Sequence, residues 1–152
     1  CDDARKRDVR AALSTYASML GRALCAAGEF NEVEGLAAEG REYGDEDDPI
    51  TQALWRQATA LVQSHRGNHA EAERLCREAV VRTRMTDSPW VQGDALCDLA
   101  TVLEATGRRD EAAGALHEAL ACYERKGIIP LVRRTRERLA ALEEVSDTSE
   151  GV

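Results

Sequence analysis

Two histidines in the middle of the chain have the spacing of a metal-binding pair. His65 and His69 are four residues apart, which on a single helix would place both imidazoles on one face. Gly67 and Asn68 lie between them, however, and these residue types favour a turn over a helix interior. We therefore interpret both histidines as side chains of a turn between helices, and the sequence predicts no metal site.

Carboxylates further along the chain could carry acid–base chemistry. Asp94 and Asp98 would share one face of a helix, and Glu104 follows on the same helix. Paired acids act as general acids and bases only when burial or mutual coupling shifts their pKa values. Cys97 is the nearest nucleophile, and two adjacent aspartates would disfavour its thiolate. A solvated or partner-facing surface is the preferred interpretation, and a hydrolase is the weakest hypothesis.

The remaining chemistry is limited by what the sequence lacks. No GxxxxGK[ST] or GxGxxG stretch is present to bind a nucleotide phosphate, so we expect no catalysis and no cofactor. The formal net charge of -8 argues against direct binding of nucleic acid, which needs a basic face. The five cysteines are isolated from one another, and no apolar run is long enough to cross a bilayer. We expect a cytoplasmic protein without membrane contact.

The elements that must position these residues recur at a fixed spacing. Pro49, Pro89 and Pro130 are separated by 40 and 41 residues. Proline is favoured in the first turn of a helix, and Asp48 and Ser88 are suited to cap such helices. Turn glycines keep almost the same step of 39 and 40 residues, at positions 28, 67 and 107. The repeating unit is therefore a helix, a tight turn and a second helix.

This pattern predicts an all-α fold. First helices are expected over residues 8–27, 50–66 and 89–106, and second helices over 30–43, 69–84 and 109–126. A last helix over 128–144 would cap the array, with its arginines Arg133, Arg134, Arg136 and Arg138 mostly facing water. We expect a single domain over residues 1–145, with units at 8–43, 50–84 and 89–126, and a flexible tail over 146–152.

The stretch from Leu99 to Ala112 resembles the tetratricopeptide repeat family, and the likeness covers about residues 14–126. The large, small and large positions of that family correspond to Leu99, Ala100 and Leu103 in the third unit. The first unit supplies Leu20, Gly21 and Leu24, and the second matches more weakly. The resemblance implies an α-solenoid of three helix-turn-helix units with a carboxyl-terminal capping helix. The units here are longer than the usual period of about 34 residues.

Such longer units are similar to the degenerate repeat arrays at the carboxyl ends of large bacterial signalling ATPases, nucleotide cyclases and transcriptional regulators. In the family, the first helices line a concave groove that binds a partner. The resemblance therefore implies a groove formed by Ser18, Arg22, Gln57, Leu61, Ser64, His65, Cys97, Thr101 and Glu104. Among these we expect Arg22, Gln57, His65 and Glu104 to contribute more to binding than the arginines of the last helix.

The packing of the units should produce one continuous core. The residues expected to be buried in it are Leu20, Leu24, Ala60, Ala72, Ala79, Leu99, Leu103, Ala112, Leu116 and Ala119. Trp55 and Trp90 have two interpretations that the sequence leaves open. They fill gaps between helices, or one of them is an exposed anchor for a partner.

Together these features predict a non-catalytic scaffold or regulatory module, part of a larger bacterial signalling or regulatory protein. Its partner would be a protein or peptide segment, or a neighbouring domain of the same polypeptide, and self-association is left open. The alternative is a small-ligand sensor that binds in the groove and controls an attached catalytic or DNA-binding domain. An enclosed pocket would favour the sensor, and an open groove would favour the scaffold.

Overall fold

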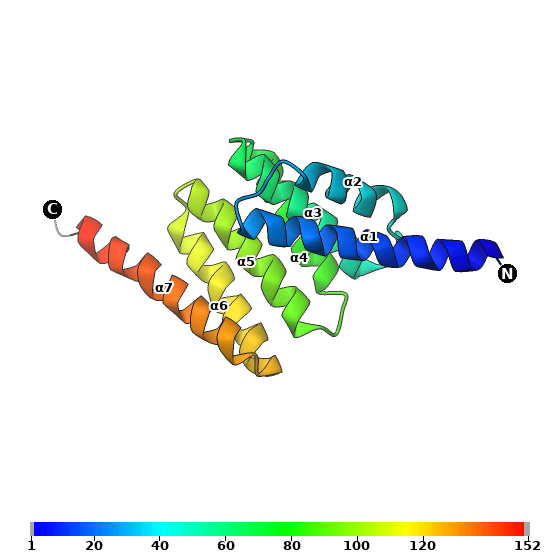
Figure 1. Ribbon diagram of the computed structural model, residues 1–152. Coiled ribbons are helices and arrows are strands. Elements are labelled where there is room, and N and C mark those ends of the chain that lie inside the picture. Colours follow the sequence, from blue (N-terminus) through cyan, green and yellow to red (C-terminus); the bar gives the residue numbers. More distant parts are fainter. Residues whose placement is uncertain (1, 151–152) are drawn as a thin grey trace.

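A computed structural model describes the backbone of residues 2–150 and the side chains of residues 5, 6 and 8–145. Within residues 2–150 the chain forms seven helices and no strand (Figure 1). They are α1 (Asp2–Ala26), α2 (Val33–Tyr43), α3 (Pro49–His65), α4 (His69–Thr83), α5 (Pro89–Ala105), α6 (Arg109–Lys126) and α7 (Ile129–Glu150). The predicted all-α fold is confirmed.

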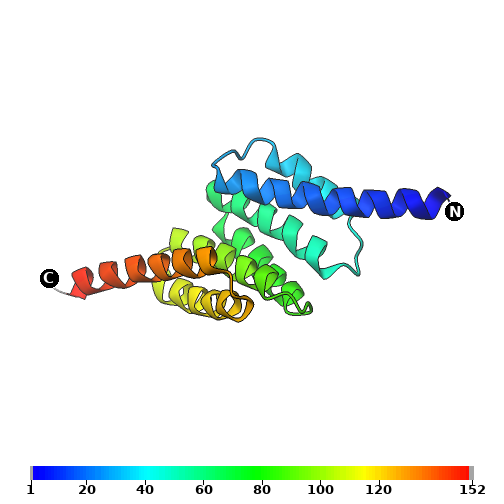
Figure 2. The ribbon, with the colours of Figure 1, turned by 60° about the horizontal axis from the view of Figure 1, so that its bottom comes forward.

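The helices pack in consecutive pairs. The pairs are α1 with α2, α3 with α4, and α5 with α6, and each pair also contacts the next (Figure 2). The first helices lie next to one another, because α3 contacts both α1 and α5. The last helix, α7, packs against α6. This arrangement is that of a helical-repeat array with an additional terminal helix, as the sequence predicted.

The repeated prolines and glycines have the local roles expected of them. Pro49 and Pro89 are the first residues of α3 and α5, where the missing backbone N–H costs no hydrogen bond. The Asp48 carboxylate accepts a hydrogen bond from the backbone N–H of Ile50 at 3.0 Å and so caps α3. The turn glycines at 28, 67 and 107 have φ values of 81°, 85° and 74°, which residues other than glycine rarely adopt.

Three helix boundaries differ from those expected by three residues or more. The second helix begins at Val33 instead of about residue 30. The first helix begins at Asp2 instead of about residue 8. The last helix continues to Glu150 instead of ending near residue 144, so residues 146–150 are helical and not a tail. Residues 151 and 152 of the expected tail lie outside the described part of the chain. Neither end carries a proline or glycine that would stop a helix near the expected boundary.

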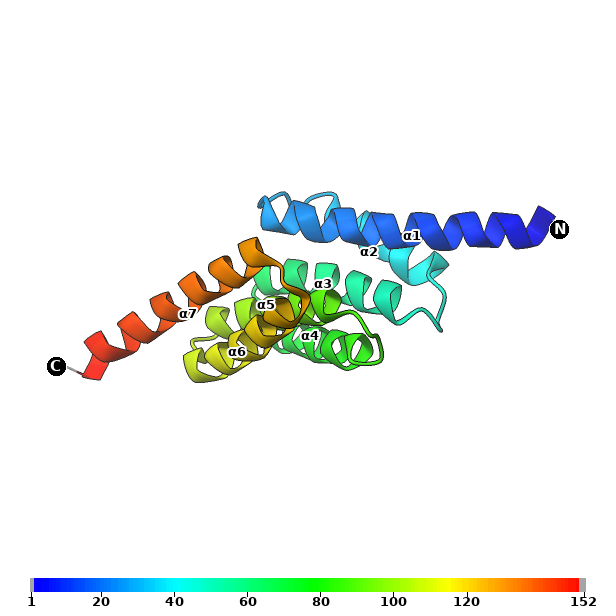
Figure 3. The same cartoon turned by 90° about the horizontal axis from the view of Figure 1, so that it is seen from below.

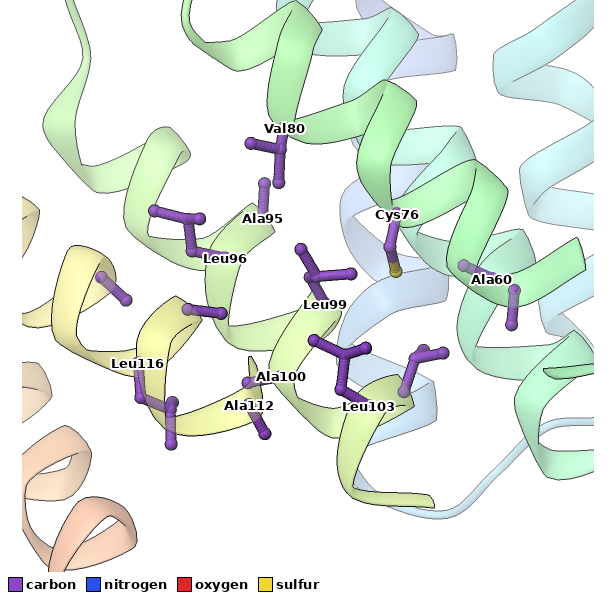
Figure 4. Close-up of a cluster of buried hydrophobic side chains, with 14 of the residues drawn as sticks. Ala60, Cys76, Val80, Ala95, Leu96, Leu99, Ala100, Leu103, Ala112 and Leu116 are labelled. Carbon is purple, nitrogen blue, oxygen red and sulfur yellow. The ribbon is translucent and has the colours of Figure 1, made fainter. Parts of the chain in front are cut away.

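The buried apolar residues form two clusters and not the one continuous core expected. The larger cluster contains eighteen buried residues from helices α3, α4, α5, α6 and α7, among them Ala60, Leu99 and Leu116 (Figure 4). The smaller cluster joins α1, α2 and α3 around Val33 and Val62. Helix α3 contributes to both clusters, so it connects the first unit to the rest of the molecule.

The expected core residues are buried with two exceptions. Eight of the ten are at most 6% exposed, namely Ala60, Ala72, Ala79, Leu99, Leu103, Ala112, Leu116 and Ala119. Leu24 is half-buried against the smaller cluster. The prediction for Leu20 is wrong, because its side chain is 52% exposed. The corresponding residue of the third unit, Leu99, is covered by α4, but no helix among the described residues occupies the equivalent place beside α1.

The two tryptophans have different surroundings. Trp55 is half-buried against the larger cluster, its indole N–H donates to Gln52 Oε1 at 3.1 Å, and the Arg56 guanidinium lies 4.1 Å from its ring centroid. This environment fits the gap-filling interpretation. Trp90 is 43% exposed.

Of the helices in the described part of the chain, none is both long and apolar enough to cross a membrane.

Candidate functional site

One face of α5 carries polar side chains every three or four residues. These are Asp94, Cys97, Asp98, Thr101 and Glu104, which we call the inner face of α5. In Figure 1, α1 and α7 lie on opposite sides of α5. Arg22 of α1 bonds to one end of the inner face and Arg138 of α7 to the other. The face is therefore bordered by a cation at each end.

Arg22 makes the most extensive of these contacts. Its Nε donates to Asp98 Oδ2 at 2.5 Å, and its Nη1 donates to Asp94 Oδ2 at 2.8 Å. The Arg22 side chain is 24% exposed, and those of Asp94 and Asp98 are 15% and 11% exposed. The Arg22 guanidinium joins α1, in the first unit, to α5, in the third unit. This contact fixes the position of α1 over α5.

Two further side chains, one from α3 and one from α6, bond to the same two aspartates. The fully buried Gln57 of α3 donates from Nε2 to Asp98 Oδ2 at 2.8 Å. The Tyr123 hydroxyl of α6 donates to Asp94 Oδ1 at 2.6 Å and lies 3.6 Å from Cys97 Sγ. Four helices thus meet at one cluster. We call Arg22, Gln57, Asp94, Asp98 and Tyr123 the Arg22 network.

Burial shifts the pKa values of three groups at this cluster. It raises the pKa of the Asp94 carboxyl above its ordinary value, and the charge of Arg22 opposes that shift. Burial also raises the pKa of the Cys97 thiol and that of the Tyr123 hydroxyl. Both groups therefore keep their protons near neutral pH, and Cys97 is not an activated nucleophile. The network is suited to hold helices in place.

Arg138 occupies the other end of the inner face. Its Nη2 donates to Glu104 Oε1 at 2.6 Å and to Thr101 Oγ1 at 3.2 Å. Arg138 is the exception to the expectation that the arginines of the last helix mostly face water. Arg133, Arg134 and Arg136 are exposed as expected. Arg138 differs because it lies three residues after Thr135, which is buried in the packed face of α7.

The predicted groove needs two corrections. Ser18 and Gln57 are fully buried, so neither side chain lines an accessible surface. Ser18 points toward α2, where its Oγ occupies the space that a side chain at Gly40 would need. His65 is exposed, and its ring stacks on Phe30 of the turn after α1 with ring centroids 4.0 Å apart. Accessible positions are Arg22, Leu61, Ser64, His65, Cys97, Thr101 and Glu104.

The prediction for the groove omitted several residues that carry its structure. Asp94 and Asp98 were recognised as a carboxylate patch, but no local signal pairs them with an arginine 72 or 76 residues away. Tyr123 gives no such local signal either. Its hydroxyl needs a partner because the ring is buried, and the partner is Asp94, 29 residues earlier in the chain.

The histidines and a nearby depression lie away from the inner face. An open surface depression at the turn from α3 to α4 is lined by Gln63 and by residues 67–71, which include His69. Among the residues whose side chains are described, no group of three or more His, Cys, Asp and Glu side chains could hold a metal ion. His65 and His69 are on different helices, as the turn glycine between them predicted.

The stacked helix pairs and the inner face define a helical-repeat protein of the α-solenoid type. Residues 60–86 and 93–126 match the tetratricopeptide repeat family. The two matched segments cover the end of α3, α4, and most of the α5–α6 pair, which is less than half of the chain. Repeats of this family generally mediate protein–protein interactions and are typically non-catalytic. None of the curated proteins compared with the chain matches it.

Proposed function

We propose that the chain is a non-catalytic scaffold or regulatory module that binds a protein segment across the inner face of α5. The observation that carries this proposal is the Arg22 network. It holds α1, α3, α5 and α6 at one cluster, so that the accessible side chains beside it are presented on a fixed surface. Binding to such a preformed surface costs little ordering of the receptor.

The accessible residues can make mixed contacts. Leu61 and Ser64 of α3 and Cys97 and Glu104 of α5 are half-buried, and Thr101 is exposed. Aliphatic, hydroxyl and carboxylate groups within one surface suit a peptide backbone with alternating side chains better than a flat apolar partner. We extend the proposal to a place in a larger bacterial signalling or regulatory protein of the cytoplasm, as the length and type of the repeats suggest.

The charge of the site indicates which segment would fit. Asp94, Asp98 and Glu104 contribute three negative charges, and Arg22 and Arg138 contribute two positive charges. The excess of one carboxylate favours a segment that carries a lysine or arginine. The half-buried Glu104 is the expected contact for it, because the ion pair of Glu104 with Arg138 is about one third exposed on both sides, 34% and 29%, and can be exchanged for one with the segment.

Selection of a random peptide library on the immobilised chain tests the proposal. We expect selected peptides to share a motif with at least one basic residue. Thr101→Arg and Glu104→Gln should each weaken their binding by about fivefold or more, since each changes an accessible contact. Arg133→Ala is the matched control, because this arginine is exposed on the same α7 helix but does not bond to the inner face.

The opposite pattern would contradict the proposal. If Arg133→Ala and Arg134→Ala abolish binding while Thr101→Arg and Glu104→Gln leave it unchanged, the last helix is an electrostatic docking surface. Binding that falls steeply with salt would accompany that result, because exposed charges are screened.

A further inference from the structure

Helix α1 carries an exposed apolar stripe on the side that faces neither α2 nor α3. Val9, Leu13, Tyr16 and Leu20 are 55%, 60%, 68% and 52% exposed. We call these four residues the α1 stripe. No charged residue interrupts the helix between Arg10 and Arg22. Four large apolar side chains in one row on a surface helix mark a contact surface, because single exposed apolar residues are ordinary but contiguous ones are not.

The repeat shows what kind of surface this is. Tyr16 and Leu20 lie 12 and 8 residues before the turn glycine Gly28, and Ala95 and Leu99 lie 12 and 8 residues before Gly107. Ala95 and Leu99 are buried, and Figure 4 shows them next to Val80 and Cys76 of α4. The Tyr16 and Leu20 part of the α1 stripe is thus equivalent to positions through which α5 stacks on the preceding helix pair, whereas Leu13 and Val9 correspond to Gln92 and to Ser88 before α5.

The stripe has a spacing that suits pairing with itself. Its residues are separated by four, three and four positions, which reads the same in both directions along the helix. An antiparallel second copy would therefore place Val9 opposite the partner's Leu20 and Leu13 opposite the partner's Tyr16. An isologous contact of this kind uses one patch twice and closes after two subunits.

The charges at the two ends of the stripe are complementary in the same arrangement. At its amino-terminal end exposed Arg5, Lys6 and Arg10 outnumber exposed Asp8, with Arg10 lying over the Tyr43 ring of α2, and exposed Glu29 and Glu32 follow its carboxyl-terminal end. Antiparallel pairing brings the basic end of each copy toward the acidic end of the other. A parallel pair would place like charges together. Figure 3 shows α1 extending beyond α2 and α3 toward the amino terminus, which leaves this part of the helix accessible.

We propose that the α1 stripe is a self-association surface, through which two copies of the chain pack α1 against α1 in antiparallel orientation. This surface is separate from the inner face of α5, so the dimer would present two inner faces to partners. The proposal does not depend on the proposed partner, and either one can fail without the other.

Sedimentation equilibrium over a range of concentrations tests the association. We expect the mass to rise from 16.6 kDa toward twice that value as the concentration of the chain increases. Leu13→Glu should keep the chain monomeric, because it places a carboxylate at the centre of the apolar contact. Val81→Glu is the matched control, since Val81 is also 60% exposed but lies on α4. Thermal unfolding followed by circular dichroism checks that both variants fold.

Disulfide trapping tests the orientation, in a chain whose Cys1 and partly exposed Cys97 and Cys122 are replaced by serine. A mixture of the Val9→Cys and Leu20→Cys variants should form a cross-linked heterodimer, because these positions are opposite each other in the antiparallel pair. Val9→Cys alone should not cross-link, since the two copies of residue 9 would be about 16 Å apart along the helix axis. Efficient cross-linking of Val9→Cys alone indicates parallel pairing and would overturn the proposal.

A chain that stays at 16.6 kDa at the highest concentration also overturns it. So does a dimer that Leu13→Glu leaves intact, because its contact would then lie on another surface.

Discussion

At the scale of single residues, the Arg22 network shows how a buried carboxylate pair is retained in a small repeat protein. Asp94 and Asp98 are one helical turn apart and both largely buried, so their charges repel in a poorly solvated place. Arg22 compensates both with one planar guanidinium, which a lysine could not do in the same geometry. The aspartates thus help to fix the positions of the helices.

We predict that Arg22→Ala lowers the free energy of unfolding by about 1 to 3 kcal/mol, since it leaves two carboxylates without their cation. Urea unfolding at pH 7 measures the loss. The loss should be smaller at pH 5, because the Asp94 carboxyl, whose pKa burial already raises, then binds a proton more readily.

Two comparisons separate this charge effect from a packing effect. Arg22→Met keeps most of the aliphatic stem but removes the charge, so it should show the same dependence on pH. Arg66→Ala removes an exposed arginine that pairs with the exposed Glu34 and should leave the unfolding curve unchanged. A loss for Arg22→Ala that is equal at both pH values would mean that the guanidinium acts only by filling space.

At the scale of elements, the close approach of α5 and α6 depends on a glycine. A Cβ atom at Gly93 would lie 2.6 Å from Tyr123 Cε1 and 2.8 Å from Tyr123 Cζ. The Tyr123 ring is only 2% exposed, and its hydroxyl is held by Asp94, so it has little freedom to move. The second helix of the third unit is therefore placed by a missing side chain on the first.

We predict that Gly93→Ala destabilises the protein by about 1 to 3 kcal/mol through overpacking, although alanine is the better helix former. Thermal unfolding measures the change. Gly114→Ala is the control within the same helix pair, because a Cβ at Gly114 meets no atom within 4 Å. It should stabilise the protein by up to about 1 kcal/mol. Equal effects of both substitutions would show that the contact with Tyr123 is not tight.

At the scale of the whole molecule, neighbouring units are joined on their outer side by ion pairs. Glu73 of α4 accepts from Arg108 at 2.5 Å, Arg77 donates to Glu111 at 3.4 Å, and Arg84 donates to Glu118 at 3.1 Å. These groups are largely exposed, so each pair contributes little and is weakened by salt. The stability of the array depends mainly on the two apolar clusters and on the Arg22 network.

We also predict that the whole chain needs neither metal nor nucleotide. Treatment with a chelator should leave its melting temperature unchanged, and the purified chain should not hydrolyse ATP or GTP. The reason is that the sequence lacks a phosphate-binding loop and that its cysteines and histidines are dispersed. A lower melting temperature after chelation would reveal a structural metal. Hydrolysis that follows the chain through successive purification steps would contradict the second part.

The sequence alone determined the helices and their repetition. Helix starts and turns depend on local chemistry, which Pro49, Pro89 and the three turn glycines carry within a few residues of where they act. Small residues such as Ala100 and Ala112 likewise mark where helices approach closely, so most of the core could be predicted from periodicity. Even the length of the unit was readable, because it follows from counting residues between equivalent positions.

The tertiary structure alone decided which polar residues meet and which apolar residues stay exposed. The partner of Asp94 and Asp98 is an arginine more than 70 residues away. The direction in which the side chain of this arginine points depends on how α1 is rotated over α5. Leu20 and Leu99 occupy the same place in the repeat, but among the described residues only Leu99 has a preceding helix pair that covers it. Periodicity assigns a residue to a face of its helix, whereas burial depends on whether another element packs against that face.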